Sequence, residues 1–144
     1  MKNFSKKYYL FFYLIIFTKT FSQNSELITN NIWFFESMTT ITKAKREKIT
    51  IFYKDENNFE SLTFRIPNIL EYYVINDGFE HTGLAKWILN EENLTIITGQ
   101  DTINGVLKIE NNILSIITYN TEPETNHGYT TIIKYHNKSK KSEE

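Results

Sequence analysis

The sequence of 144 residues contains no cysteine, only two prolines and only five glycines. Without cysteine the chain can form no disulfide, no thiolate metal site and no cysteine nucleophile. The formal net charge is −1, so the chain lacks the basic excess that is typical of nucleic-acid-binding domains. The length is that of a single domain.

The first 22 residues have the three-part layout of a secretory signal peptide. Three lysines among the first seven residues form a basic start, and residues 8–17 are uncharged and apolar. Thr20 and Ser22 then supply the small residues that precede a cleavage site. Because the apolar run is shorter than the about 20 residues that cross a bilayer, we expect cleavage after Ser22. A buried first strand or an uncleaved anchor is the alternative.

Cleavage would change the charge and the expected destination of the protein. The removed segment holds four lysines and no acidic residue, so the remaining 122 residues would carry 12 basic and 17 acidic residues, a net charge of −5. A bacterial lipoprotein needs a cysteine at its cleavage site, and this chain has none. We therefore expect an exported protein, periplasmic or extracellular, without a membrane anchor in its mature form.

The remainder of the chain predicts consecutive short strands. β-Branched and aromatic residues alternate with polar ones, and turn-type clusters interrupt them every 8–12 residues, a pattern that favours an all-β sandwich or barrel. The strongest hairpin signal is Asn76-Asp77-Gly78. The only helical candidate, Thr39–Lys48, lacks apolar residues at helical spacing and is interpreted as a charged loop. The nine predicted strands are Asn31–Ile41, Lys48–Lys54, Phe59–Ile66, Ile69–Ile75, Leu84–Leu89, Leu94–Thr98, Ile103–Glu110, Ile113–Tyr119 and Tyr129–Tyr135.

Short turns between these strands imply antiparallel neighbours in chain order, because parallel strands need long crossovers. A meander of about eight strands removes its exposed edges by closing on itself. We therefore predict an antiparallel up-and-down β-barrel over residues 23–137, followed by a disordered charged tail over residues 138–144. A barrel of eight strands either fills its interior with side chains or holds one small ligand.

Several short motifs occur in the order found in a known family. They are Trp33, Leu62-Thr63-Phe64-Arg65, Asn76-Asp77-Gly78, the segment 83–89 around Trp87, and the segment 107–116. With them the chain resembles the small secreted bacterial lipocalin-like domains. The resemblance implies an eight-stranded barrel that holds a small hydrophobic molecule, although lipocalin-like folds also serve structural or inhibitory roles.

The chain departs from the lipocalin pattern at two points. It has Asn31-Ile32-Trp33 where lipocalins often have Gly-x-Trp. Lipocalins also often pack an arginine from a late strand over that tryptophan, whereas the two arginines here are Arg46 and Arg65. The resemblance therefore supports the barrel more than it supports ligand carriage.

Aromatic residues are the most informative part of residues 23–144. Some are in phase with the apolar faces of their strands and would line an interior cavity if the barrel is open. The candidate ligand-binding residues are Phe35, Tyr53, Phe64, Tyr72 and Trp87, and Tyr119 has a similar phase. The alternative is a filled core in which the same rings interdigitate. Phe34, Phe52 and Tyr73 are out of phase, which predicts an outer patch that could bind a partner.

The sequence contains no motif for catalysis, a cofactor or a metal. It has no P-loop, no dinucleotide fingerprint, no Gly-x-Ser-x-Gly and no His-Glu-x-x-His. Glu122, Glu124 and His127 share one loop, which we interpret as a solvated acidic loop rather than a metal site. We therefore expect no enzyme. Two functions stay open: a barrel that binds a small hydrophobic molecule, and a structural or protein-interaction barrel with a filled core.

Overall fold

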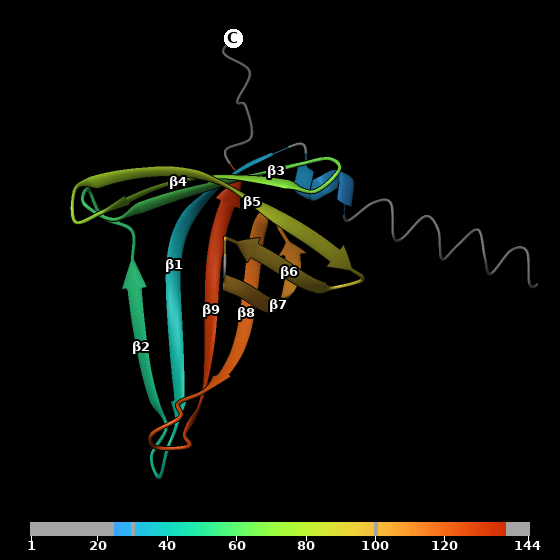
Figure 1. Cartoon of the computed structure of the whole chain (residues 1–144). Coiled ribbons are helices and arrows are strands. Elements are labelled where there is room, and N and C mark those ends of the chain that lie inside the picture. Colours follow the sequence, from blue (N-terminus) through green and yellow to red (C-terminus); the bar gives the residue numbers. More distant parts are fainter. Residues whose placement is uncertain (1–24, 30, 100, 138–144) are drawn as a thin grey trace, which may run out of the picture.

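The computed structural model describes residues 25–29, 31–99 and 101–137, in which nine antiparallel strands accompany one short helix over residues 25–29 (Figure 1). The all-β prediction is confirmed, and each of the nine predicted runs is a strand. The short helix was not predicted. The strands are β1 (Ile32–Lys43), β2 (Lys48–Tyr53), β3 (Phe59–Arg65), β4 (Ile69–Asn76), β5 (Phe79–Asn90), β6 (Asn93–Thr98), β7 (Asp101–Glu110), β8 (Ile113–Thr121) and β9 (Gly128–Asn137).

Eight of the strands close into a barrel. They follow the order β1-β3-β4-β5-β6-β7-β8-β9, and the pairing of β1 with β9 closes the ring. The predicted meander barrel of about eight strands is therefore confirmed. β2 lies outside the ring, because it pairs with the later part of β1 only, so β1 and β3 are neighbours without being consecutive in the chain.

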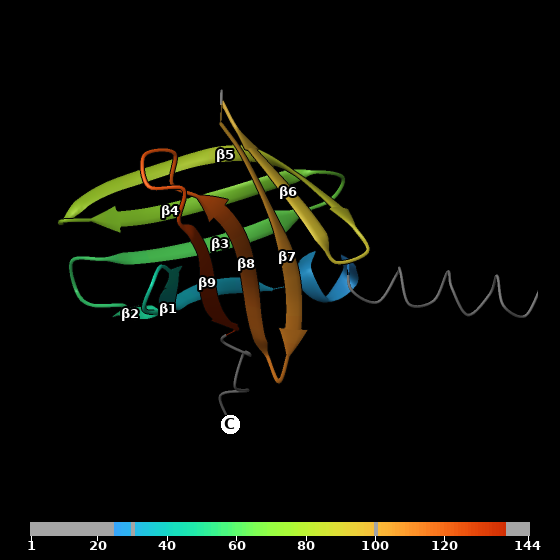
Figure 2. The same ribbon diagram turned by 90° about the horizontal axis from the view of Figure 1, so that it is seen from below.

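Strand pairing around the ring is continuous at one end and interrupted at the other. β1 pairs with β3 only through Ile32–Phe34, and β7 pairs with β8 only over its last five residues. Beyond these contacts the strands diverge, so that β3, β4 and β5 run in one direction while β1, β2, β8 and β9 run in another (Figure 1). Seen from below, β7, β8 and β9 cross the layer formed by β3, β4 and β5 (Figure 2).

We call the two ends of the barrel the closed end and the open end. The closed end contains the helix over residues 25–29 and the β3–β4, β5–β6 and β7–β8 turns. The open end contains the β1–β2, β4–β5 and β8–β9 connections. There, the first lobe consists of the start of β3, the end of β4 and the start of β5. The second lobe consists of β2, the later part of β1, the end of β8 and the start of β9.

Two local features accompany the divergence of the strands. The register between β1 and β9 shifts between Phe35 and Ser37, as in a β-bulge, which bends a strand and raises its twist. Gly105 lies where β7 leaves β8, and a Cβ atom added there would be 2.8 Å from the carbonyl oxygen of Ile117. A glycine at this position therefore permits a close approach of the two backbones.

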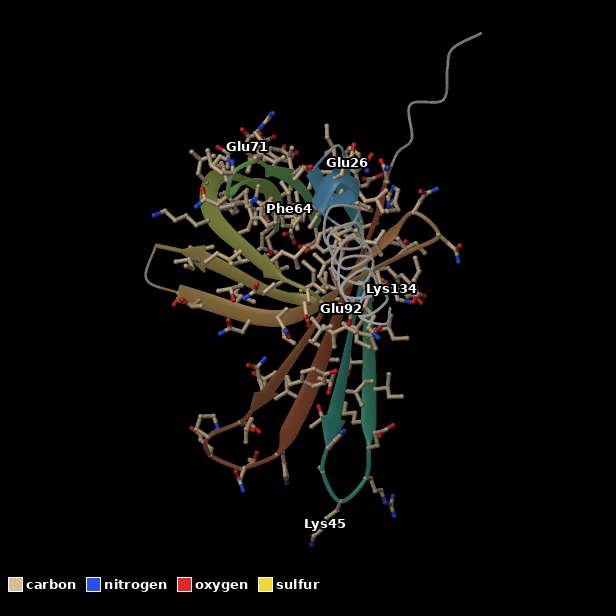
Figure 3. The ribbon with its side chains drawn as sticks, turned by 90° about the vertical axis from the view of Figure 1, so that its right-hand side faces the viewer. Glu26, Lys45, Phe64, Glu71, Glu92 and Lys134 are labelled. Carbon is tan, nitrogen blue, oxygen red and sulfur yellow. The ribbon has the colours of Figure 1, made fainter. Side chains whose placement is uncertain are left out.

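The closed end is filled by large apolar side chains. Trp33, Phe64 and Ile28 are among the most buried side chains, and the rings of Phe64 and Trp87 meet edge to face with their centroids 5.4 Å apart. Each indole N–H donates to a backbone carbonyl: Trp33 to Ile28 at 3.0 Å, and Trp87 to Arg65 at 3.1 Å. The short helix therefore covers this end of the barrel, and Phe64 lies in the barrel interior (Figure 3).

Some predictions concern parts of the chain that the structure does not describe. The predicted signal peptide, residues 1–22, and the predicted charged tail, residues 138–144, lie outside the described residues. Among the residues that are described, no helix has the length and apolar character needed to cross a membrane.

Candidate functional site

The candidate site lies in the barrel interior, at the point where the first and second lobes separate. In β3, Leu62 and Phe64 are buried and face inward. Because side chains alternate between the two faces of a strand, Glu60 points to the same side as these two residues. Glu60 is thus an acidic side chain directed into the interior, next to the place where β3 loses its pairing with β1.

The side chains of Glu60 and of Tyr135 in β9 interact inside the barrel, because hydrogen bonding between them contributes to the pKa of both groups. Tyr135 is only 2% exposed, so the contact is inside the barrel. Burial raises the pKa of Glu60, and the hydrogen bond from Tyr135 offsets part of that rise. Burial, together with the negative charge and hydrogen bond of Glu60, raises the pKa of Tyr135 well above its usual value. The barrel therefore holds a carboxyl and a phenol in a poorly hydrated place.

Aromatic and apolar side chains surround this pair. The rings of Phe35 and Tyr135 meet edge to face at a centroid distance of 6.1 Å, and the rings of Phe35 and Phe52 are also 6.1 Å apart. Met38 and Ile133 pack nearby against the core, and they are paired across β1 and β9. The site therefore combines three rings from β1, β2 and β9 with one carboxylate from β3.

No basic side chain of the described residues neutralises Glu60. Their one ion pair joins Arg65 and Glu71 at 2.7 Å, both on the outer face, as the position of Glu71 in Figure 3 shows. A carboxylate offers about four lone-pair sites, more than one tyrosine hydroxyl can occupy. The remaining acceptor capacity of Glu60 is directed into the interior, where none of the basic side chains that the structure describes forms an ion pair with it.

Four of the five predicted site residues face the interior. Phe35 contacts Tyr135 at the candidate site, whereas Phe64 and Trp87 form part of the packed core at the closed end. Tyr72 packs against that core, and its ring lies across Gly83 on the neighbouring strand, where any side chain would collide with it. All four residues therefore face the same interior. Phe35 and Tyr72 are the two that lie nearest the open end.

The fifth predicted residue, Tyr53, is on the other face of its strand, where it is 64% exposed. Phe52, which the alternation placed outside, faces the interior and contacts Phe35. The reason is the bulge at Glu36: it reverses the phase of β1, so that Met38 faces inward together with its partner Phe52. The prediction for Phe52 is therefore wrong, and Tyr53 does not line the interior. Tyr119 is exposed as well.

Phe34 and Tyr73 lie on the outer face, as predicted. Phe34 packs against Phe59 and His136 at centroid distances of 6.0 and 5.9 Å, and Phe59 packs against Tyr73 at 6.2 Å. These four rings form a row across β9, β1, β3 and β4. Beside Tyr73, a shallow groove of about 380 Å³ lies on the outside of β3, β4 and β5, and its lining includes Thr63, Glu71 and Leu84.

Sequence reasoning missed Glu60 as a site residue, although a signal for it was present. Glu60 has the same phase as Leu62 and Phe64, so an acidic residue interrupts an otherwise apolar face of one strand. A charge at such a position is more informative than a further aromatic residue, because an unpaired buried charge is costly.

In the acidic loop between β8 and β9, Glu122 accepts two hydrogen bonds from residues of the same loop. The hydroxyl of Thr125 donates to the carboxylate of Glu122 at 2.5 Å, and the amide of Asn126 donates to the carbonyl of Glu122 at 2.8 Å. Across residues 25–29, 31–99 and 101–137, no group of three or more potential ligands of the His, Cys, Asp or Glu type comes together.

Comparisons of the chain with known protein families, with curated proteins and with solved structures find no match.

Proposed function

We propose that this chain is an exported, lipocalin-like binding barrel that holds one small, largely hydrophobic molecule toward its open end. The observation that carries the proposal is the pairing of Glu60 with Tyr135 among aromatic rings, in the part of the interior where the strands diverge. Ligand sites are typically apolar, with a few polar groups that orient the guest.

The two ends of the barrel suggest where the molecule binds. The closed end is occupied by Trp33, Phe64 and their neighbours, so a ligand there would have to displace close-packed side chains. At the open end, Phe35 and Phe52 offer apolar ring surface beside the Glu60–Tyr135 pair. We therefore place the body of the ligand against these two rings. Export is supported by the signal-like layout of residues 1–22.

The proposal is tested by native mass spectrometry of the protein purified from its own host, together with titration of an apolar fluorescent probe. We expect a bound mass above that of the bare chain, or binding of one probe molecule per chain that shields the probe from water. A bare mass combined with an unchanged probe spectrum would overturn the proposal.

A second function, the protein-interaction barrel, is favoured by the outer face of the second lobe. Ile49, Ile51 and Tyr53 of β2 are exposed there, and the edge of β2 that faces away from β1 pairs with no other described strand. Exposed apolar strand edges are common sites of association. This alternative predicts that Ile51→Lys abolishes capture of a specific partner, while Glu60→Gln leaves capture unchanged. Capture that survives Ile51→Lys would contradict it.

A further inference from the structure

Within the described part of the chain, the interior of the open end holds an acidic side chain with no basic side chain beside it. Three other acidic or basic side chains of the strands have the inward phase, and all three are exposed near strand ends: Lys48, His81 and Asp101. Lys48 is four residues from Phe52, about 13 Å along the strand. His81 is two strands away from Glu60 in the same row, a separation of about 10 Å. Neither basic residue is therefore a direct partner of the Glu60 carboxylate.

We infer that the molecule held at the open end is an amphipathic amine, whose ammonium group lies against Glu60 and whose apolar body lies against Phe35 and Phe52. This inference rests on the proposed function and specifies its ligand class. A half-buried carboxylate is stabilised by an opposite charge that donates hydrogen bonds. An ammonium group supplies both the positive charge and the hydrogen-bond donors. The lone pairs of Glu60 that Tyr135 does not use can accept hydrogen bonds from it.

The aromatic surroundings favour a cation as well. Tyr135, Phe35 and Phe52 form a continuous row of rings with successive centroids 6.1 Å apart. Cations are attracted to the faces of such rings at distances up to about 6 Å, most strongly where water is excluded. The same rings provide the apolar surface that a hydrocarbon chain covers. One end of the ligand is thus recognised by charge and the other by burial.

Other ligand classes fit this arrangement less well. A carboxylic acid or phosphate would place a second negative charge beside Glu60, which is unfavourable at low dielectric. A neutral alcohol could donate one hydrogen bond but would leave the carboxylate charge unbalanced. A metal ion would need several ligands, and Glu60 belongs to no group of three potential ligands within the described residues.

A matched ligand series tests the inference on the unaltered protein. Octylamine, octan-1-ol and octanoate share an apolar chain and differ in the charge of the head group. At pH 7 we expect octylamine to bind at least tenfold more tightly than octan-1-ol, and octanoate to bind most weakly, by calorimetry or displacement of the apolar probe. Equal affinities for the amine and the alcohol would overturn the inference while leaving the proposed function standing. Failure of both to bind would overturn the two together.

The Glu60→Gln variant identifies the group responsible. It keeps an acceptor for Tyr135 and removes the charge, so the preference for octylamine should fall to about twofold or less while octan-1-ol binds as before. Glu71→Gln is the matched control, because Glu71 is on the outer face beside Arg65, and the preference should remain. A tenfold preference that survives Glu60→Gln would overturn the inference.

Discussion

The closed and open ends of this barrel are made by the same strands, yet they differ in what those strands direct inward. At the closed end the inward residues are large and apolar, and both indole N–H groups reach a backbone carbonyl. At the open end the inward residues include Glu60 and Tyr135, and β2 lies outside the ring, paired with β1 only. The difference indicates that one end stabilises the fold, whereas the other accepts a costly polar pair that stability alone does not require.

Removing a ring from the closed end should cause the largest loss of stability. Phe64→Ala should lower the free energy of unfolding by about 3–5 kcal/mol, since it leaves a cavity in a close-packed core. Phe52→Ala at the open end removes a ring that is already 39% exposed and should have a much smaller effect. Urea denaturation of both variants provides the measurement. Equal losses would show that the two ends contribute alike to stability.

A second prediction concerns the place where β7 leaves β8. Gly105→Ala should destabilise the protein by about 1–3 kcal/mol, because the added methyl group meets the backbone oxygen of Ile117 rather than a movable side chain. Gly128→Ala is the control, since nothing lies within 4 Å of its added Cβ atom. Thermal unfolding of both variants measures the difference. A melting temperature that is unchanged in Gly105→Ala would mean that the close approach is not needed.

The smallest expected effect is the pH-dependent stability contributed by Glu60. Its pKa is raised in the folded state above the usual 4.5, so the folded protein binds this proton more tightly than the unfolded chain does. This contribution to stability is complete below the unfolded pKa and is lost as the pH rises through the folded pKa. Glu60→Gln should therefore melt a few degrees higher than the unaltered protein at pH 8 and at the same temperature at pH 4. A lower melting temperature at pH 8 would show that the charged carboxylate stabilises the fold.

Much of this architecture could be predicted because alternation at period two is visible in single strands. It predicted nine strands and the inward phase of Phe35, Phe64, Tyr72 and Trp87. It could not predict the phase of β2, since that depends on a bulge at Glu36 that no glycine marks. The helix over residues 25–29 has fewer than two turns, too few to show a helical period. The partner of Glu60 could not be predicted either, because Tyr135 is 75 residues away in the chain and reaches it only when the ring closes.

Phe52 and Tyr53 provide the most direct test of the claim that the open end binds a ligand. They are consecutive aromatic residues of β2 whose side chains lie on opposite faces of one sheet, and both are exposed, so either can be replaced at similar cost to the fold. In titrations of the apolar fluorescent probe, Phe52→Ser should weaken binding at least fivefold, whereas Tyr53→Ser should leave it within twofold of the unaltered protein. Equal weakening by the two substitutions, or a larger loss with Tyr53→Ser, would contradict a binding site inside the barrel.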